Sequence, residues 1–129
     1  NPILALKEIT RVLKKDGYLI LTAPFVSATH FAPYHFCTGF SQYFYEKHLI
    51  DLGYEIVEIS QNGNLFESIA QDLRILNSFA KQYTSQSLSI FDRICRYFLL
   101  RKLQKLSNED KESNKYMCYG NHVLAKKII

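Results

Sequence analysis

The apolar positions of the first 25 residues predict a helix, a tight turn and a buried strand. Residues 1–16 carry apolar side chains at helical spacing opposite charged ones, and Asn1-Pro2 is typical of a helix start. Gly17 is expected to supply the left-handed turn that ends this helix. Residues 18–22 are apolar without alternation, as in a strand covered on both faces, and Pro24, which has no N–H, is expected to stop it.

The pattern then predicts a second helix and a second strand. Ser41 can cap this helix and Gly53 can end it. Its expected buried stripe is Phe44, His48 or Leu49, and Leu52. Residues 55–60 alternate between apolar and polar side chains, which is typical of a strand with one more exposed face.

Two further amphipathic helices and a closing strand complete the chain. Asn64 and Glu67 resemble a capping box at the start of a helix of about five turns. The expected apolar stripe of that helix is Phe66, Ile69, Leu73, Leu76 and Ala80. The apolar positions of the next helix are Phe91, Ile94, Cys95, Phe98, Leu99 and Leu106. Residues 116–126 are expected to form the last strand, with Gly120 as a bulge, so that the fold class is α/β.

The irregular stretch of residues 26–40 holds the candidate chemistry. Loops at the carboxyl ends of strands form the ligand crevice in open α/β sheets. Histidine as a residue type has an unperturbed pKa near neutrality, so His30 or His35 could act as a general base in catalysis. The alternative is that both histidines only bind backbone groups of the loop. The aromatic side chains expected to contact a substrate are Phe31, Tyr34, Phe36 and Tyr43.

A metal site in the same stretch is a weaker interpretation. His30, His35 and Cys37 give the spacing H-x4-H-x-C. Zinc sites usually have four ligands, often with two cysteines in a Cys-x-x-Cys pair, and no fourth ligand here is suitably spaced. We therefore assign no metal ligand.

Four segments of the sequence resemble class I S-adenosylmethionine-dependent methyltransferases, of the kinds described as type 11 or type 12. Residues 11–24, R-V-L-K-K-D-G-Y-L-I-L-T-A-P, resemble the fourth helix and fifth strand of that family. Residues 53–59, G-Y-E-I-V-E-I, and residues 120–127, G-N-H-V-L-A-K-K, resemble its last two strands. Residues 30–36, H-F-A-P-Y-H-F, resemble the loop over the substrate, although many relatives have Asp at the place of His35.

The resemblance implies a fold and a function. The fold is a partial Rossmann-like sheet of three strands with the closing strand central and antiparallel to the other two, plus surface helices and an added helix pair. Residues 1–129 would be the C-terminal half of the methyltransferase-like domain, with a helical insertion at residues 65–106. The implied enzyme transfers a methyl group from S-adenosylmethionine to an acceptor that the sequence does not identify, largely by positioning the reactants.

The positions of the glycines argue against a cofactor-binding site within this chain. Cofactor binding in these enzymes uses a Gly-rich turn and an acidic residue at a strand end, whereas the five glycines here are far apart and form no G-x-G. No residue is therefore assigned to cofactor binding. We expect the cofactor-binding half to be absent from this chain, and the chain alone to be inactive.

Composition adds little to this picture. The 129 residues suffice for one core, and the net charge is +4. Three scattered cysteines indicate a reducing compartment, and without a signal peptide or a spanning apolar run we expect a cytoplasmic protein. The basic side chains at residues 93–105 could meet nucleic acid, a phosphate group or an anionic membrane surface, but such a face is usually solvated, and nucleic acid is not expected.

The rival hypothesis is a non-enzymatic protein. In it, residues 64–106 form a helical interaction or dimerisation module on a small sheet. Apolar surface left exposed on the chain would favour self-association. A G-x-G-x-G turn encoded upstream of Asn1 would favour the enzyme over this module.

Overall fold

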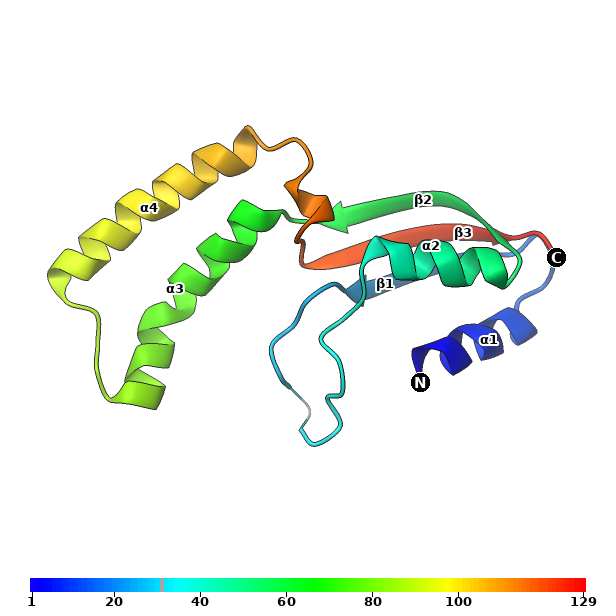
Figure 1. The fold of residues 1–129 in the computed structure, drawn as a ribbon, viewed down its shortest axis with the longest axis horizontal. Helices are drawn as coiled ribbons and strands as arrows, with labels where there is room; N and C mark the ends of the chain where they lie inside the picture. The colour runs from blue at the N-terminus through cyan, green and yellow to red at the C-terminus, as the bar shows by residue number, and fades with distance from the viewer. Residues whose placement is uncertain (31) are drawn as a thin grey trace. The chain divides into compact units, whose positions relative to one another are not determined.

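The computed structural model describes residues 1–30 and 32–129, which form an α/β fold (Figure 1). Its helices are α1 (Pro2–Val12), α2 (Gln42–Asp51), α3 (Leu65–Thr84) and α4 (Ile90–Asn108), with a short 3-10 helix, η1, at Ser113–Lys115. Its strands are β1 (Tyr18–Pro24), β2 (Tyr54–Asn62) and β3 (Gly120–Lys127). The chain divides into two compact units: the sheet unit, residues 1–62 and 118–129, and the helical unit, residues 63–117.

The three strands form one open sheet in the order β1-β3-β2, and β3 is antiparallel to both neighbours. The prediction that the closing strand is central is therefore confirmed. The strand begins at Gly120 rather than at residue 116, and the expected bulge at Gly120 is wrong, because the register shift lies in β2 between Ile56 and Glu58. Gly120 allows a close approach instead: an added Cβ would lie 2.8 Å from the Ala23 carbonyl oxygen.

Helix α1 begins as predicted but ends earlier. The Asn1 side chain accepts hydrogen bonds from the N–H groups of Ile3 and Leu4, at 3.1 and 3.2 Å. The helix ends at Val12, and Asp16, not Gly17, takes the left-handed conformation, with φ of 63°. Aspartate tolerates this conformation better than most residues. The Lys126 ammonium donates to the Asp16 carboxylate at 3.0 Å, and this hydrogen bond lowers the pKa of Asp16.

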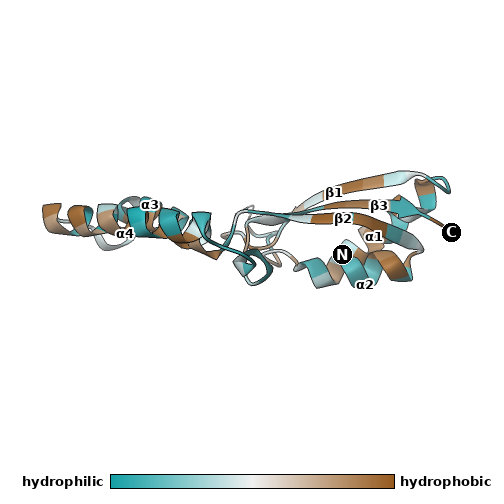
Figure 2. Cartoon of the chain, turned by 90° about the horizontal axis from the view of Figure 1, so that it is seen from above, coloured by the Kyte–Doolittle hydropathy of each residue, from teal (hydrophilic) through white to brown (hydrophobic). Residues whose placement is uncertain are grey.

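Strand β1 is longer than predicted, and only one of its faces is covered. Pro24 belongs to the strand because its missing N–H lies on the open edge, where β3 is not its neighbour. Burial alternates along β1, and Ile20 is 78% exposed. The expectation that both faces of β1 are covered is therefore wrong for the described residues: α1 and α2 lie on the same side of the sheet (Figure 2).

The core of the sheet unit lies between these two helices and the sheet. It is built from Leu6 of α1, Tyr45 and Leu49 of α2, and Tyr54, Val123 and Ala125 of the strands. In α2 the buried positions are Tyr45 and Leu49, so Leu49 rather than His48 is the correct one of the two predicted alternatives. The predicted Phe44 and Leu52 are half-buried and pack against the core. The sequence pattern did not select Tyr45, which belongs to the same core.

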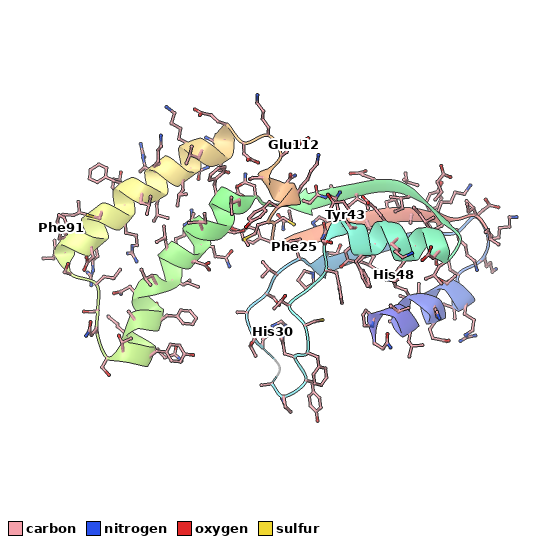
Figure 3. The ribbon with its side chains drawn as sticks, viewed as in Figure 1. Phe25, His30, Tyr43, His48, Phe91 and Glu112 are labelled. Carbon is pink, nitrogen blue, oxygen red and sulfur yellow. The ribbon has the colours of Figure 1, made fainter. Side chains whose placement is uncertain are left out.

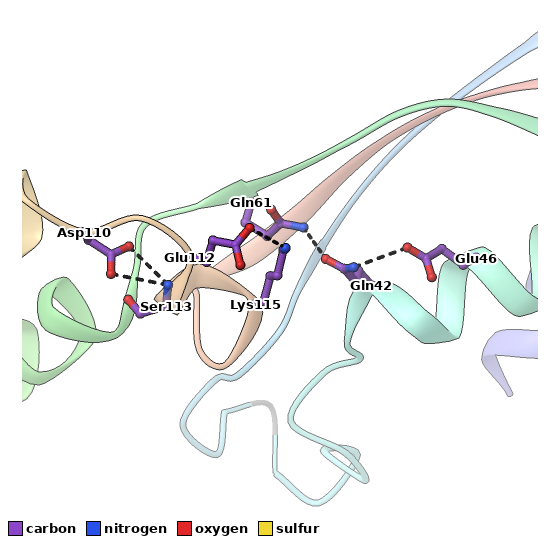
Figure 4. Close-up of polar contacts among 7 residues, drawn as sticks. All are labelled: Gln42, Glu46, Gln61, Asp110, Glu112, Ser113 and Lys115. Carbon is purple, nitrogen blue, oxygen red and sulfur yellow. Dashed lines mark hydrogen bonds and ion pairs between the residues drawn. The ribbon is translucent and has the colours of Figure 1, made fainter.

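Side-chain hydrogen bonds fix the ends of elements within each unit (Figure 4). In the sheet unit, Gln61 Nε2 donates to Gln42 Oε1 at 2.8 Å, which ties β2 to the first turn of α2. In the helical unit, the Ser113 N–H donates to the Asp110 carboxylate at 3.3 Å. Lys115 Nζ pairs with Glu112 at 2.8 Å in the same unit.

The helical unit consists of α3 and α4 side by side, running in opposite directions (Figure 1). The Asn64 side chain caps α3 by accepting from the Glu67 N–H at 3.1 Å, as predicted. Ser89 and Asp92 form a full capping box on α4. The predicted apolar stripe of α4 is wrong as a core: Phe91, Ile94 and Phe98 are exposed, and the buried residue is Leu103. In α3, likewise, the buried residues are Ser68 and Ala70.

None of the helices in the described part of the chain has the length and apolarity that crossing a bilayer requires.

Candidate functional site: a groove at the end of β1

An open groove of about 670 Å³ lies where β1 ends. Its walls come from the loop at residues 27–40, from the last two residues of β1 and from the start of α1. The lining residues are Asn1, Pro2, Ala23, Pro24, Ser27, His30, Tyr34, His35, Phe36, Cys37, Thr38, Gly39 and Phe40. Figure 3 labels His30 on this loop.

The base of the loop is closed by hydrogen bonds that the sequence pattern does not reveal. The Phe40 N–H donates to the Pro24 carbonyl at 3.1 Å, so the loop returns to the open edge of β1. The Ser27 hydroxyl donates to the Thr38 carbonyl, also at 3.1 Å. Gly39 has φ of 151°, and an added Cβ would lie 2.2 Å from the Pro24 carbonyl oxygen, so only glycine fits there.

The two candidate catalytic histidines lie together in the groove wall. Their ring centroids are 4.8 Å apart in an edge-to-face arrangement. The His30 backbone N–H donates to His35 Nδ1 over a long 3.5 Å, and His30 Nδ1 lies 2.8 Å from the Ala28 carbonyl oxygen. The structure thus brings together the two histidines that the sequence singled out.

These contacts indicate different tautomers for the two imidazole rings. A carbonyl oxygen can only accept, so His30 Nδ1 carries the proton and His30 Nε2 carries the lone pair. His35 Nδ1 accepts from a backbone N–H, so its proton lies on Nε2. That Nε2 atom is buried and has no hydrogen-bond partner among the described residues. His30 is therefore suited to take up a proton, and His35 to hold the backbone of His30 through Nδ1.

The four aromatic residues that the sequence predicted to contact a substrate differ in their position relative to the groove. Tyr34 and Phe36 line the groove and are largely exposed, Phe36 to 86%. Tyr43 is exposed on the first turn of α2, but it is not among the residues that line the groove. Phe31 lies outside the described residues.

The remaining histidines and the metal candidates contribute nothing further to the groove. His48 packs against the Phe44 ring, with centroids 4.6 Å apart, and His122 Nδ1 lies 3.0 Å from the Thr22 hydroxyl. Within residues 1–30 and 32–129, no three His, Cys, Asp or Glu side chains gather closely enough to hold a metal ion.

Sequence reasoning missed Tyr45, which is buried in the core, and Asn121, which holds the groove loop. Burial raises the pKa of the Tyr45 hydroxyl, and Cys37 in the groove wall adds a smaller effect in the same direction. Asn121 of β3 is 1% exposed, and its Nδ2 donates to the Phe40 carbonyl at 3.0 Å. The available signal for Asn121 was its place shortly before residues 123–125, the apolar run of β3.

Replacing Asn121 by alanine is expected to lower the free energy of unfolding by about 1–2 kcal/mol, because the Phe40 carbonyl loses its donor. Urea denaturation followed by circular dichroism measures the change. His122→Ala is the matched control on the neighbouring, exposed position, and its effect is expected to stay within about 0.5 kcal/mol. Equal losses in both variants would mean that Asn121 does not hold the loop.

Comparison with models of known protein families gives no match, and comparison with curated proteins gives no significant match.

Proposed function

We propose that this chain is the substrate-side half of an S-adenosylmethionine-dependent methyltransferase. The observation that supports this most strongly is the strand order β1-β3-β2 with β3 antiparallel to both neighbours. The resemblance of residues 11–24, 53–59 and 120–127 to class I methyltransferases implied this order. A local helix and strand pattern alone would not have required the last strand to enter between the other two.

The position of the groove also supports the proposal. It lies at the carboxyl end of β1, where open α/β sheets bind their ligands. The exposed rings of Tyr34 and Phe36 offer a flat apolar contact to an acceptor molecule. The two histidine rings stand beside these aromatic side chains in the same groove wall.

In this proposal the two histidines have separate roles. His30 Nε2 takes the proton that the acceptor loses as its nucleophilic atom gains the methyl group. The Ala28 carbonyl holds the His30 ring in the required tautomer through Nδ1. His35 Nδ1 accepts from the His30 backbone N–H at 3.5 Å and so helps to hold the base in position. Both roles require only groups that the loop already holds within the groove.

The described residues do not fit the methyl donor itself. The lining of the groove contains no carboxylate that could bind the ribose hydroxyls. No pair of close glycines exists in the 129 residues to form the cofactor turn. The proposal therefore requires further residues to hold S-adenosylmethionine. The open edge of β1 and the uncovered face around Ile20 are the surfaces on which such residues would pack.

Transfer of labelled methyl groups tests the proposal. The polypeptide encoded by the complete reading frame is incubated with methyl-labelled S-adenosylmethionine and an extract of the organism that encodes it. We expect label to enter an acceptor, and the omission of the polypeptide to abolish incorporation. Absence of incorporation by a polypeptide that binds the cofactor and folds would contradict the proposal for this groove.

A non-enzymatic interaction module is the second candidate function. It is favoured by the apolar side chains that α3 and α4 leave uncovered, among them Ile90 and Phe91. A complete reading frame whose product neither binds the cofactor nor transfers label would favour this candidate.

A further inference from the structure

The helical unit has an unusually small interior. It is a single layer of two helices, and its buried residues are Ser68, Ala70 and Leu103. In the connection between the helices, the Leu88 N–H donates to Asn77 Oδ1 of α3 at 3.0 Å. Within the helical unit, no third layer covers either helix (Figure 2).

The connection between the helices is surrounded by exposed apolar side chains. We call this group the hairpin tip; its members lie in the second half of α3 and the first half of α4 and are 44% to 78% exposed. They are Leu76, Phe79, Tyr83, Ile90, Phe91, Ile94, Tyr97 and Phe98. Five of the eight are aromatic, and Figure 3 labels Phe91 at the start of α4. Water contact with this much apolar surface is unfavourable, so the tip is suited to a partner.

Helix α4 also concentrates positive charge. It carries Arg93, Arg96, Arg101, Lys102 and Lys105, against the single carboxylate of Asp92. That carboxylate is engaged in the capping box, accepting from the Ser89 N–H at 2.9 Å and from its hydroxyl at 2.7 Å. The partner of this surface must therefore bring negative charge as well as apolar material.

Apolar and basic side chains share one face of α4. Ile90, Ile94 and Phe98 follow each other at intervals of four residues, and Arg101 and Lys105 continue the same row at helical spacing. This row is exposed along its whole length. One face thus offers apolar side chains near the hairpin tip and basic side chains farther along the helix.

We propose that the helical unit docks on the surface of an anionic phospholipid bilayer. Amphipathic helices that lie in a bilayer surface combine aromatic and aliphatic side chains, which enter the boundary of the acyl chains, with lysine and arginine, which reach the phosphate groups. Long basic side chains can bury their stems while the charged ends stay at the headgroups. The hairpin tip and the second half of α4 supply these two components.

Charge and chemistry favour a bilayer over two other occupants. A second copy of this chain would bring five more basic side chains of α4 against the first five, and like charges at close range repel. Nucleic acid would satisfy the basic side chains but would leave Ile90 and Ile94 in water, because recognition of single strands uses aromatic rings and cations rather than aliphatic groups. A bilayer accommodates both kinds of side chain.

Sedimentation with vesicles tests the proposal on the 129-residue chain. We expect the chain to sediment with vesicles of phosphatidylcholine mixed with phosphatidylglycerol, and much less with phosphatidylcholine alone. Replacing Arg101, Lys102 and Lys105 by glutamine is expected to weaken binding to the mixed vesicles on the order of a hundredfold, since each basic residue near such a surface contributes roughly fivefold. Phe91→Ser with Phe98→Ser is expected to weaken binding to both vesicle types.

Matched controls separate docking from misfolding and from net charge. Replacing Lys7, Lys14 and Lys15 by glutamine removes the same charge from the sheet unit and is expected to leave binding within about twofold of the parent chain. All the replaced side chains are exposed, and circular dichroism checks that each variant keeps its helix content. Vesicle binding is compared with that of the parent chain only for variants that have the same helix content as the parent chain.

Four outcomes would overturn the proposal. They are absence of binding to either vesicle, equal binding to both, an equal loss of binding in the control variant, and a dimer in analytical ultracentrifugation that the Phe91→Ser, Phe98→Ser variant abolishes. Tighter binding to a single-stranded oligonucleotide than to mixed vesicles would assign the basic face to nucleic acid instead. The proposal does not depend on methyl transfer, so it stands or fails separately from the function of the groove.

Discussion

Replacing Leu49 by alanine is expected to lower the free energy of unfolding by about 2–5 kcal/mol. Leu49 is 0% exposed in the last turn of α2, within the cluster that includes Leu6, Tyr45 and Val123. The variant loses the transfer free energy of the removed carbons and leaves a cavity that the sheet cannot fill. Since small domains are stable by only about 5–15 kcal/mol, a large part of the chain population should be unfolded at elevated temperature.

The neighbouring residue provides a matched control. Ile50 lies on the same helix and loses a similar number of carbons when replaced by alanine, but it is 61% exposed. Ile50→Ala is therefore expected to change the free energy of unfolding by less than about 1 kcal/mol. Denaturation by guanidinium chloride, followed by circular dichroism, measures both variants. Equal losses would mean that α2 does not pack on the sheet through Leu49.

If the proposed methyl transfer takes place in this groove, replacing His30 is expected to lower the turnover of the polypeptide encoded by the complete reading frame by about a hundredfold or more, the usual contribution of a general base. The reason is that His30 Nε2 holds the lone pair, while Nδ1 is engaged with the Ala28 carbonyl at 2.8 Å. Glutamine in this position can form hydrogen bonds but cannot take up a proton. His30→Gln should therefore be as slow as His30→Ala when turnover is measured with labelled cofactor.

His35 should respond differently to the same pair of substitutions. Its role is to accept the hydrogen bond of the His30 N–H at Nδ1, and a glutamine side chain can also accept one. His35→Gln is thus expected to keep most of the activity that His35→Ala loses. His48→Gln is the control, since His48 packs against Phe44 and does not line the groove. Unchanged turnover in both single variants and in the double variant would leave His30 and His35 as structural groups of the loop.

The features that the sequence predicted correctly depend on neighbouring residues or on the family resemblance. The cap of Asn1 on α1 and the cap of Asn64 on α3 join residues two or three positions apart, so a short pattern contains all the participants. The strand order followed from the resemblance. The pairing of the two histidines could be expected from their closeness in one loop, but not their different tautomers, because these depend on the Ala28 carbonyl and on a backbone N–H.

The features that failed depend on distant residues. The turn after α1 places the Asp16 N–H on the Lys127 carbonyl at 2.9 Å, a partner 111 positions away, so the local preference of Gly17 for a left-handed turn did not decide it. Which face of α4 is buried depends on where α3 contacts it. The residue buried there is Leu103, whereas Phe91, Ile94 and Phe98 of the predicted apolar stripe are exposed. Asn121 was missed for the same reason: its partner, the Phe40 carbonyl, is 81 residues away.

Titration of S-adenosylmethionine in a calorimeter tests most directly the claim that this chain is the substrate-side half of a methyltransferase. Two samples are compared: the 129-residue chain and the polypeptide encoded by the complete reading frame. We expect no measurable binding to the first, because its groove has no carboxylate for the ribose, and roughly micromolar binding to the second. Micromolar binding to the 129-residue chain alone, or the absence of binding to both samples, would contradict this claim.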